Sequence, residues 1–175
     1  MSAYMLTDTA IRIEKASVNE INAILAISKA TWEPTYREIL SKAQLDYMYD
    51  EIYTPTSLEK QMNELGQVFL VLYSTDAPAA YASYGQKTPG DNAAHKLHKL
   101  YVHPNFQGQN LGRALVAAVE KEVKELGANV LELNVNRYNP AIRFYERCGY
   151  KQAREEDIAI GEFWMNDFVM RKELR

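Results

Sequence analysis

Residues 96–112, which read KLHKLYVHPNFQGQNLG, are the most informative segment of this sequence for its fold. Residues 97–102 are predicted to form a strand that ends before Pro104 and Asn105. A short polar turn then leads into the clearest helix of the chain. Apolar residues recur along one face of that helix, at Leu111, Ala114, Leu115, Ala118, Val119, Val123 and Leu126. Gly127 follows, where a left-handed C-terminal cap belongs.

The junction between this strand and this helix predicts a phosphate site. A helix start offers unpaired N–H groups and the positive end of a dipole, and both favour an anion. Gly108 and Gly112 allow the backbone to approach that anion closely, although glycines here can also serve the turn alone. The junction has neither the Gly-Lys-Ser/Thr of a P-loop nor the three glycines of a dinucleotide fingerprint.

In the rest of the chain, the apolar periodicity and the turn residues predict strands and helices in an order typical of a single mixed α/β domain over residues 1–175. Ser17 and Glu20 have the spacing of a capping box before a helix, and Pro34 is expected to begin a fresh helical segment. Further helices are expected at 43–51, 57–65 and 140–148, and further strands at 10–15, 68–73, 79–86, 130–135, 150–154 and 163–171. Residues 76–78 suggest a hairpin turn, and residues 87–93 a loop.

Composition excludes several classes of protein. The formal net charge of −3 argues against a nucleic-acid binder. Cys148 is the only cysteine, so no intrachain disulfide forms, and no His/Cys cluster has metal-ligand spacing, so no metal is expected. The N-terminus lacks the pattern of a signal peptide, and no apolar run approaches the roughly 18 residues of a membrane span. A cytoplasmic protein that does not bind membranes is expected.

Two motifs resemble those of one family. The segment LYVHPNFQGQNLGRAL, residues 100–115, resembles the coenzyme A motif of the GNAT superfamily, a Leu-x-Val strand followed by Gln/Arg-x-x-Gly-x-Gly/Ala. Gln107 matches its first position and Gly112 its last. Asn110 replaces the usual middle glycine, and asparagine tolerates left-handed backbone better than most residues.

The second motif is NVNRYNPAIRFYERCGY, residues 134–150, which resembles the family's Asn-x-x-Ala-x-x-x-Tyr followed by Gly-Phe/Tyr. Ala141 and Tyr145 keep the motif's spacing. Asn139 stands one residue closer to Ala141 than the pattern asks, but its place before Pro140 suits a helix cap. The two motifs cover roughly the second half of the chain. In the first half, TWEPTY at residues 31–36 resembles the polyamine-acetylating and related small-amine branches.

The resemblance implies a GNAT-like α/β fold, with a mixed, mostly antiparallel sheet flanked by helices and splayed strands that hold acetyl-CoA. It implies an N-acetyltransferase in which a primary amine, a small amine or polyamine, attacks acetyl-CoA directly in a ternary complex. The cofactor-binding residues so implied are Leu100, Tyr101 and Val102 for the pantetheine arm, Gln107, Gly108, Gln109, Asn110, Leu111, Gly112 and Arg113 for the pyrophosphate, and Asn139 and Tyr145.

The resemblance also suggests catalytic and substrate-binding residues. Tyr145 is the candidate general acid for the departing thiolate, the alternative being a tyrosine that packs its helix on the sheet. His98, two residues before Leu100 on its strand, is the candidate base, the alternative being a structural or surface histidine with water as the proton path. Trp32 and Tyr36, four residues apart, can form an aromatic wall for an alkylamine or belong to the core.

Two other functions remain open from sequence. One is a protein or peptide N-acetyltransferase that acts on N-termini or lysines. The other is a non-catalytic acyl-CoA sensor that regulates a partner, for which the Asn110 departure leaves room. A homodimer is also left open, and Glu33, Glu38 and Asp167 are carboxylates able to attract a cation.

Overall fold

The structure is a computed structural model that describes residues 10–175. The helices in this range are η1 (Val18–Glu20), α1 (Ile21–Tyr36), α2 (Lys42–Ile52), α3 (Pro55–Asn63), η2 (Pro104–Phe106), α4 (Leu111–Glu125) and α5 (Ala141–Arg147). The strands are β1 (Ile11–Lys15), β2 (Val68–Ser74), β3 (Ala77–Gln86), β4 (Ala94–Val102), β5 (Val130–Asn136), β6 (Lys151–Ile160) and β7 (Phe163–Glu173). Every expected strand is present, and so are the expected helices except a separate one that begins at Pro34; the ends of the elements are shifted.

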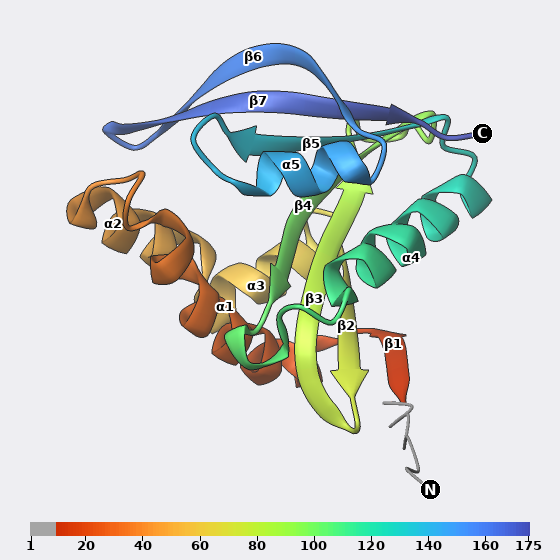
Figure 1. Cartoon of the computed structure of the whole chain (residues 1–175), viewed down its shortest axis with the longest axis horizontal. Helices are drawn as coiled ribbons and strands as arrows, with labels where there is room; N and C mark the ends of the chain where they lie inside the picture. Colours follow the sequence, from red (N-terminus) through yellow and green to blue (C-terminus); the bar gives the residue numbers. More distant parts are fainter. Residues whose placement is uncertain (1–9) are drawn as a thin grey trace, which may run out of the picture.

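The strands form one seven-stranded sheet in the order β1-β2-β3-β4-β5-β7-β6. The β4–β5 pair is parallel and every other pair is antiparallel, which confirms the expected mixed, mostly antiparallel sheet. Helices α4 and α5 cover one face, and α1 to α3 lie on the other (Figure 1). Alternation along β2 sends Leu70 and Leu72 to the α4 face and Phe69 and Val71 to the α1 face.

Strands β4 and β5 pair only at their beginnings. Their register runs from Ala94 opposite Val130 to Leu97 opposite Leu133, and beyond this point the two strands diverge (Figure 1). At the same place the register of β4 with β3 shifts by one residue, which leaves His98 as an extra residue in β4. Such a bulge bends a strand and raises its twist. The fold therefore opens a wedge between the C-terminal ends of β4 and β5.

Helix α4 carries most of the predicted apolar stripe into the core, but Leu126, the last predicted member, follows the helix and is 50% exposed. Leu111, Leu115, Val119 and Val123 are at most 2% exposed and pack against β2, β3 and β4. Gly127 ends the helix with φ +98, which confirms the expected left-handed cap. The other end of the helix, at Leu111, lies at the open end of the wedge beside Leu100 and Val102.

The structure corrects the expectation for Pro34. Helix α1 runs without interruption from Ile21 to Tyr36, so Pro34 lies inside its last turn and begins no new helix. A proline there costs the helix one backbone hydrogen bond near its end, and the buried packing of Trp32 outweighs that loss. The capping box of Ser17 and Glu20 is confirmed.

Two boundaries near turns also differ from expectation. The β2–β3 turn lies at Thr75 and Asp76, both with positive φ, and the predicted turn residues Ala77 and Pro78 already belong to β3. Strand β6 runs to Ile160, well beyond the expected end at Arg154. It is an edge strand that is mostly exposed, so it lacks the apolar alternation that would reveal it in the sequence.

The expectation about a signal peptide falls mainly on residues 1–9, which lie outside the described range. Over residues 10–175, no helix combines the length and the apolar character that crossing a bilayer requires.

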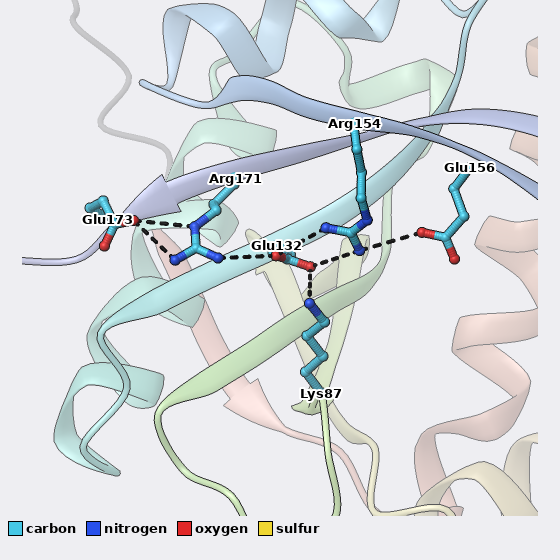
Figure 2. A network of polar contacts seen from close by, with 6 residues as sticks. All are labelled: Lys87, Glu132, Arg154, Glu156, Arg171 and Glu173. Atoms are coloured by element: carbon cyan, nitrogen blue, oxygen red, sulfur yellow. Dashed lines mark hydrogen bonds and ion pairs between the residues drawn. The ribbon is translucent and has the colours of Figure 1, made fainter.

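A network of ion pairs joins the sheet at the end where β4 and β5 are still paired. Its members are Lys87, Glu132, Arg154, Glu156, Arg171 and Glu173 (Figure 2). Glu132 on β5 is 3% exposed and lies at the centre, 2.8 Å from Lys87 Nζ. Burial raises the pKa of Glu132, but the contacts with Lys87 and Arg154 outweigh burial, and the pKa is lowered overall. Glu132 therefore connects the β3–β4 loop to the three strands beyond β4.

Replacing Glu132 with Gln is expected to lower the free energy of unfolding at pH 7 by about 1–3 kcal/mol, because the cations lose their shared counter-charge. A carboxylate with a lowered pKa stabilises the fold above its unfolded pKa, near 4.5, and that contribution is lost as the pH falls through the folded pKa. The difference between wild type and E132Q, measured by urea denaturation, should therefore shrink below about pH 4.5.

The control is Glu173→Gln, which removes an exposed carboxylate at the edge of the same network. Its effect should stay within about 0.5 kcal/mol. A wild-type advantage over E132Q that is as large at about pH 3.5 as at pH 7 would contradict the ion-pair explanation.

Candidate active site

Three adjoining cavities follow the wedge between β4 and β5. The glycine-turn groove has a volume of about 590 Å³ and is lined by Leu100, Val102, Phe106, Gln107, Gly108, Asn110, Leu111, Gly112, Arg113, Ala141, Phe144, Tyr145, Arg147 and Cys148. The middle cavity, about 320 Å³, shares Leu100, Val102, Gln107, Ala141 and Tyr145 with the groove. The aromatic cavity, about 480 Å³, shares Tyr36, His98, Lys99, Tyr101 and Asn134 with the middle cavity.

The turn before α4 has the backbone that the sequence motif requires. Gly108 has φ +80 and Asn110 has φ +59 with ψ +21, so Asn110 adopts the left-handed conformation expected of the missing glycine. The first backbone bond of α4 runs from Ala114 N–H to Asn110 C=O at 3.1 Å, so the amides before Ala114 have no partner in the helix. These free donors border the groove.

Gly112 has a different role from Gly108. A Cβ at Gly112 would lie 3.3 Å from Cζ of Phe144, so its absence lets α4 and α5 approach each other. Arg113 Nη2 donates to Arg147 C=O at 3.0 Å, which joins the same two helices across the rim of the groove. Gln107 Nε2 donates to Val102 C=O at 3.3 Å, whereas Gln109 is exposed and does not line the groove.

The free edge of β4 borders the groove and the middle cavity. Beyond Leu97 this strand has no partner on its β5 side, so backbone groups along Leu100 to Val102 are open to an added strand-like ligand. The side chains of Leu100 and Val102 pack toward α4, while Tyr101 packs toward α1. An extended ligand with amide groups fits this edge.

Tyr145 on α5 is shared by the groove and the middle cavity. Its ring packs against Phe144 and Tyr150, with centroids 5.1 and 6.1 Å away. Burial raises the pKa of Tyr145, so its hydroxyl stays protonated at neutral pH. Asn139 Oδ1 accepts a hydrogen bond from Ala141 N–H, at the start of α5, at 2.9 Å, although the residue directly before the helix is Pro140.

The bulge changes the environment assumed for His98. Simple alternation along the strand predicts that His98 lies on the same face as Leu100 with an ordinary pKa, but His98 is the extra residue of the bulge. Its imidazole borders the middle and aromatic cavities and is exposed, although protein atoms lie close enough around it to desolvate it. Burial, together with Lys99 and Lys96, lowers the pKa of His98 to about 3. His98 is therefore a neutral group at pH 7, and a weaker base than the sequence suggests.

Trp32 and Tyr36 lie beside each other on α1, with ring centroids 4.6 Å apart. Trp32 is 6% exposed, and its Nε1 donates to Leu45 C=O at 3.0 Å, so it belongs to the core as well as to the cavity wall. Tyr36 borders both the middle and aromatic cavities. The two rings thus stand where an aromatic wall was expected.

Lys99 is a cavity residue that the sequence analysis missed. It is 9% exposed, and its Nζ donates to Gln61 Oε1 at 2.5 Å and to Gln67 Oε1 at 3.1 Å. Burial, together with Lys96, lowers the pKa of Lys99 to about 7. The sequence did offer a signal for a buried lysine, because Lys99 lies in a predicted strand that also holds Leu97 and Leu100. Among residues 10–175, no group of three or more His, Cys, Asp or Glu is placed to bind a metal ion.

The arrangement defines a class of protein. Free helix amides beside a left-handed turn fit a pyrophosphate, and the open β4 edge fits the amides of a pantetheine arm. The two sequence motifs, far apart in the chain, meet at Tyr145 in one continuous groove. These features are those of a coenzyme A-dependent acyltransferase.

The chain belongs to the family described as acetyltransferase (GNAT) domain, whose model matches residues 34–174. A spermidine N(1)-acetyltransferase of Thermoplasma acidophilum is 24% identical over 93% of this chain and 97% of its own. An L-methionine sulfoximine/L-methionine sulfone acetyltransferase of Salmonella typhimurium is 32% identical, with 63% of this chain and 67% of its own covered. The crystal structure of PaiA N-acetyltransferase from Thermoplasma acidophilum in complex with coenzyme A has a TM-score of 0.78 at 23% identity, with 94% and 99% of the two chains covered.

These comparisons confirm the predicted GNAT fold, the acetyltransferase activity and acetyl-CoA as the cosubstrate. The roles of individual side chains and the identity of the acceptor stay predictions.

The left-handed turn can be tested at Asn110. Replacing Asn110 with Ala should lower the free energy of unfolding by about 1 kcal/mol and weaken coenzyme A binding, because alanine disfavours φ +59. Asn110→Gly is the matched control and should retain both properties, since glycine adopts this backbone freely. Urea denaturation and calorimetric titration with coenzyme A measure the two effects. Equal behaviour of the two variants would show that the turn does not depend on this conformation.

Proposed function

We propose that this protein is an N-acetyltransferase whose acceptor is a small primary amine, attacked directly in a ternary complex with acetyl-CoA. The observation that carries the proposal is the continuity of the three cavities. Tyr145 belongs to the groove and the middle cavity, and the middle cavity adjoins the aromatic cavity, with Tyr36 and His98 in the wall of both. Coenzyme and amine can therefore enter from opposite sides and meet beside Tyr145.

The names of the relatives support an amine acceptor. One is a spermidine acetyltransferase, and the other acts on methionine sulfoximine and sulfone. The aromatic cavity is lined by α1, α2, α3, β4 and the β6–β7 hairpin, and its volume of about 480 Å³ suits a small molecule better than a folded protein. These observations favour a small amine over a peptide.

The proposal assigns roles to the start of α4, the free edge of β4, Tyr145 and His98. Amides at the start of α4 bind the pyrophosphate, and the β4 edge orients the pantetheine arm. Acetyl-CoA supplies the acetyl group as a thioester. As the amine forms its C–N bond and the C–S bond breaks, the Tyr145 hydroxyl donates its proton to the departing sulfur. The proton released by the amine leaves through His98 or a water beside it, and the phenol is reprotonated from solvent.

Tyr145→Phe is expected to lower kcat by about 100-fold, because the variant lacks the proton donor while it keeps the ring packing. Coenzyme A affinity should change less than about threefold, since the groove is otherwise intact. Thiol release from acetyl-CoA measures turnover, and calorimetry measures binding. Tyr138→Phe is the matched control, because Tyr138 is 76% exposed and lines none of the three cavities. Unchanged turnover of Y145F would remove Tyr145 from the mechanism.

His98 can be tested by its pH dependence. Because the pKa of His98 is about 3, the imidazole does not titrate between pH 5 and 9, and it cannot cause a change in kcat/KM near pH 6.5. His98→Gln should therefore lower kcat by about tenfold at every pH in this range, with the midpoint of the profile unmoved. A midpoint near 6.5 in wild type that disappears in H98Q would show an ordinary, titrating imidazole instead.

A further inference from the structure

The carboxylate of Asp167 lines the aromatic cavity without a charged partner. Asp167 on β7 is 5% exposed, and its Oδ1 accepts no hydrogen bond. No Lys, Arg or His between residues 10 and 175 forms an ion pair with it. Arg137 donates to its backbone oxygen, but the Arg137 guanidinium pairs with Asp157 and Glu155. A buried carboxylate without a counter-charge lowers the stability of the fold, which indicates that the residue serves another purpose, such as binding a ligand.

The groups around Asp167 do not supply the missing charge. The Asn134 side chain lies nearby, and its Nδ2 also has no partner, but a neutral amide can satisfy one lone pair of a carboxylate and not its charge. Lys96 lines the same cavity without an ion pair to Asp167, and Lys99 is held by two glutamines. Glu156, opposite Asp167 on β6, adds a like charge. Burial raises the pKa of Asp167, and the opposing effects of Asn134, Lys96 and Arg137 do not cancel it.

Asp167 also stands apart from the reacting atoms. It lines the aromatic cavity but not the middle cavity, where Tyr145 lies. Tyr36 and Asn134 border both cavities, so a molecule of modest length can extend from Asp167 past them to Tyr145. A group that binds Asp167 would therefore lie in a different cavity from Tyr145.

Aromatic rings in the same cavity favour a positive group. Trp32, Tyr36, Tyr53 and Tyr101 line it together with Asp167. Their ring centroids follow one another at 4.6 Å for Trp32 and Tyr36, 5.4 Å for Trp32 and Tyr53, and 6.4 Å for Tyr53 and Tyr101. Ring faces attract cations, and they do so most strongly where water is excluded. A carboxylate beside such rings forms an ammonium site.

We infer that Asp167 binds a second ammonium group of the acceptor, so that the enzyme selects diamines or longer polyamines over monoamines. This inference rests on the proposed function, and it adds the residue that sets its specificity. The far ammonium donates hydrogen bonds to Asp167, and the near amine reaches the middle cavity. An incoming ammonium also favours the charged carboxylate, so binding removes the unfavourable feature that the free enzyme carries.

The test compares 1,4-diaminobutane with n-butylamine, two acceptors of equal carbon length that differ in the second ammonium. Wild type should favour the diamine by about tenfold or more in kcat/KM. Asp167→Asn should lose about 10- to 100-fold for the diamine, mainly through KM, and less than about threefold for n-butylamine. Its melting temperature should equal or exceed that of wild type, because an unpaired buried charge is removed.

The matched control is Glu156→Gln, which neutralises the carboxylate opposite Asp167 on β6 but lies outside the cavity wall. It should keep the preference for the diamine. Calorimetric titration of the coenzyme A complex with 1,4-diaminobutane gives a readout that does not depend on turnover. The comparison of the two amines in wild type remains informative even if D167N does not fold.

Each outcome decides between the two proposals. Equal use of both amines by wild type, or an unchanged preference in D167N, overturns the role of Asp167 and leaves the amine acetyltransferase standing. Asp167-dependent binding of the diamine with no turnover of either amine supports the ammonium site and contradicts the proposed function. Absence of both turnover and Asp167-dependent binding contradicts both.

Discussion

The site depends on the place where β4 and β5 stop pairing. The two strands share register only as far as Leu97 and Leu133, and the extra residue His98 bends β4 at that point. Regular pairing would fill the wedge with backbone hydrogen bonds and leave no free edge. Because the strands part, one side of the wedge faces the start of α4 and the other faces α1. The bulge thus lies where the wedge opens, between the groove beside α4 and the cavities beside α1.

A sheet that opens at one end needs compensation at the other. Only a short parallel pairing joins β1–β4 to β5–β7. This β4–β5 boundary is the seam between the two halves of the sheet, and few backbone hydrogen bonds hold it together. Glu132 lies at the closed end of that seam and joins Lys87, from the loop before β4, to Arg154 and Arg171 on the outer strands. These ion pairs therefore hold the two halves of the sheet together at one end, while at the other end β4 and β5 share no backbone hydrogen bonds.

Local patterns in the sequence revealed the elements that position the coenzyme, and they missed what depends on tertiary contact. Most of the stripe of α4, the left-handed Asn110 and the Asn139 hydrogen bond at the start of α5 follow from residue type and spacing, and all are present. Pro34 and the length of β6 did not follow, because packing holds α1 together and an exposed edge strand has no apolar signal. The bulge at His98 has no sequence signature either, so its environment could not be foreseen.

Burial is the common cause of the unusual protonation along the cavities, and it favours the neutral form of each group. It raises the pKa of Tyr145 and Asp167, and it lowers the pKa of His98 to about 3 and of Lys99 to about 7. A neutral imidazole and a partly neutral lysine repel an incoming cation less than their charged forms do. An ammonium group entering the cavity thus meets little repulsion and one carboxylate whose ionisation its own arrival promotes. On the proposed role of Asp167, cation binding and the charge of this carboxylate are coupled, and the pocket would favour acceptors that bring a positive charge with them.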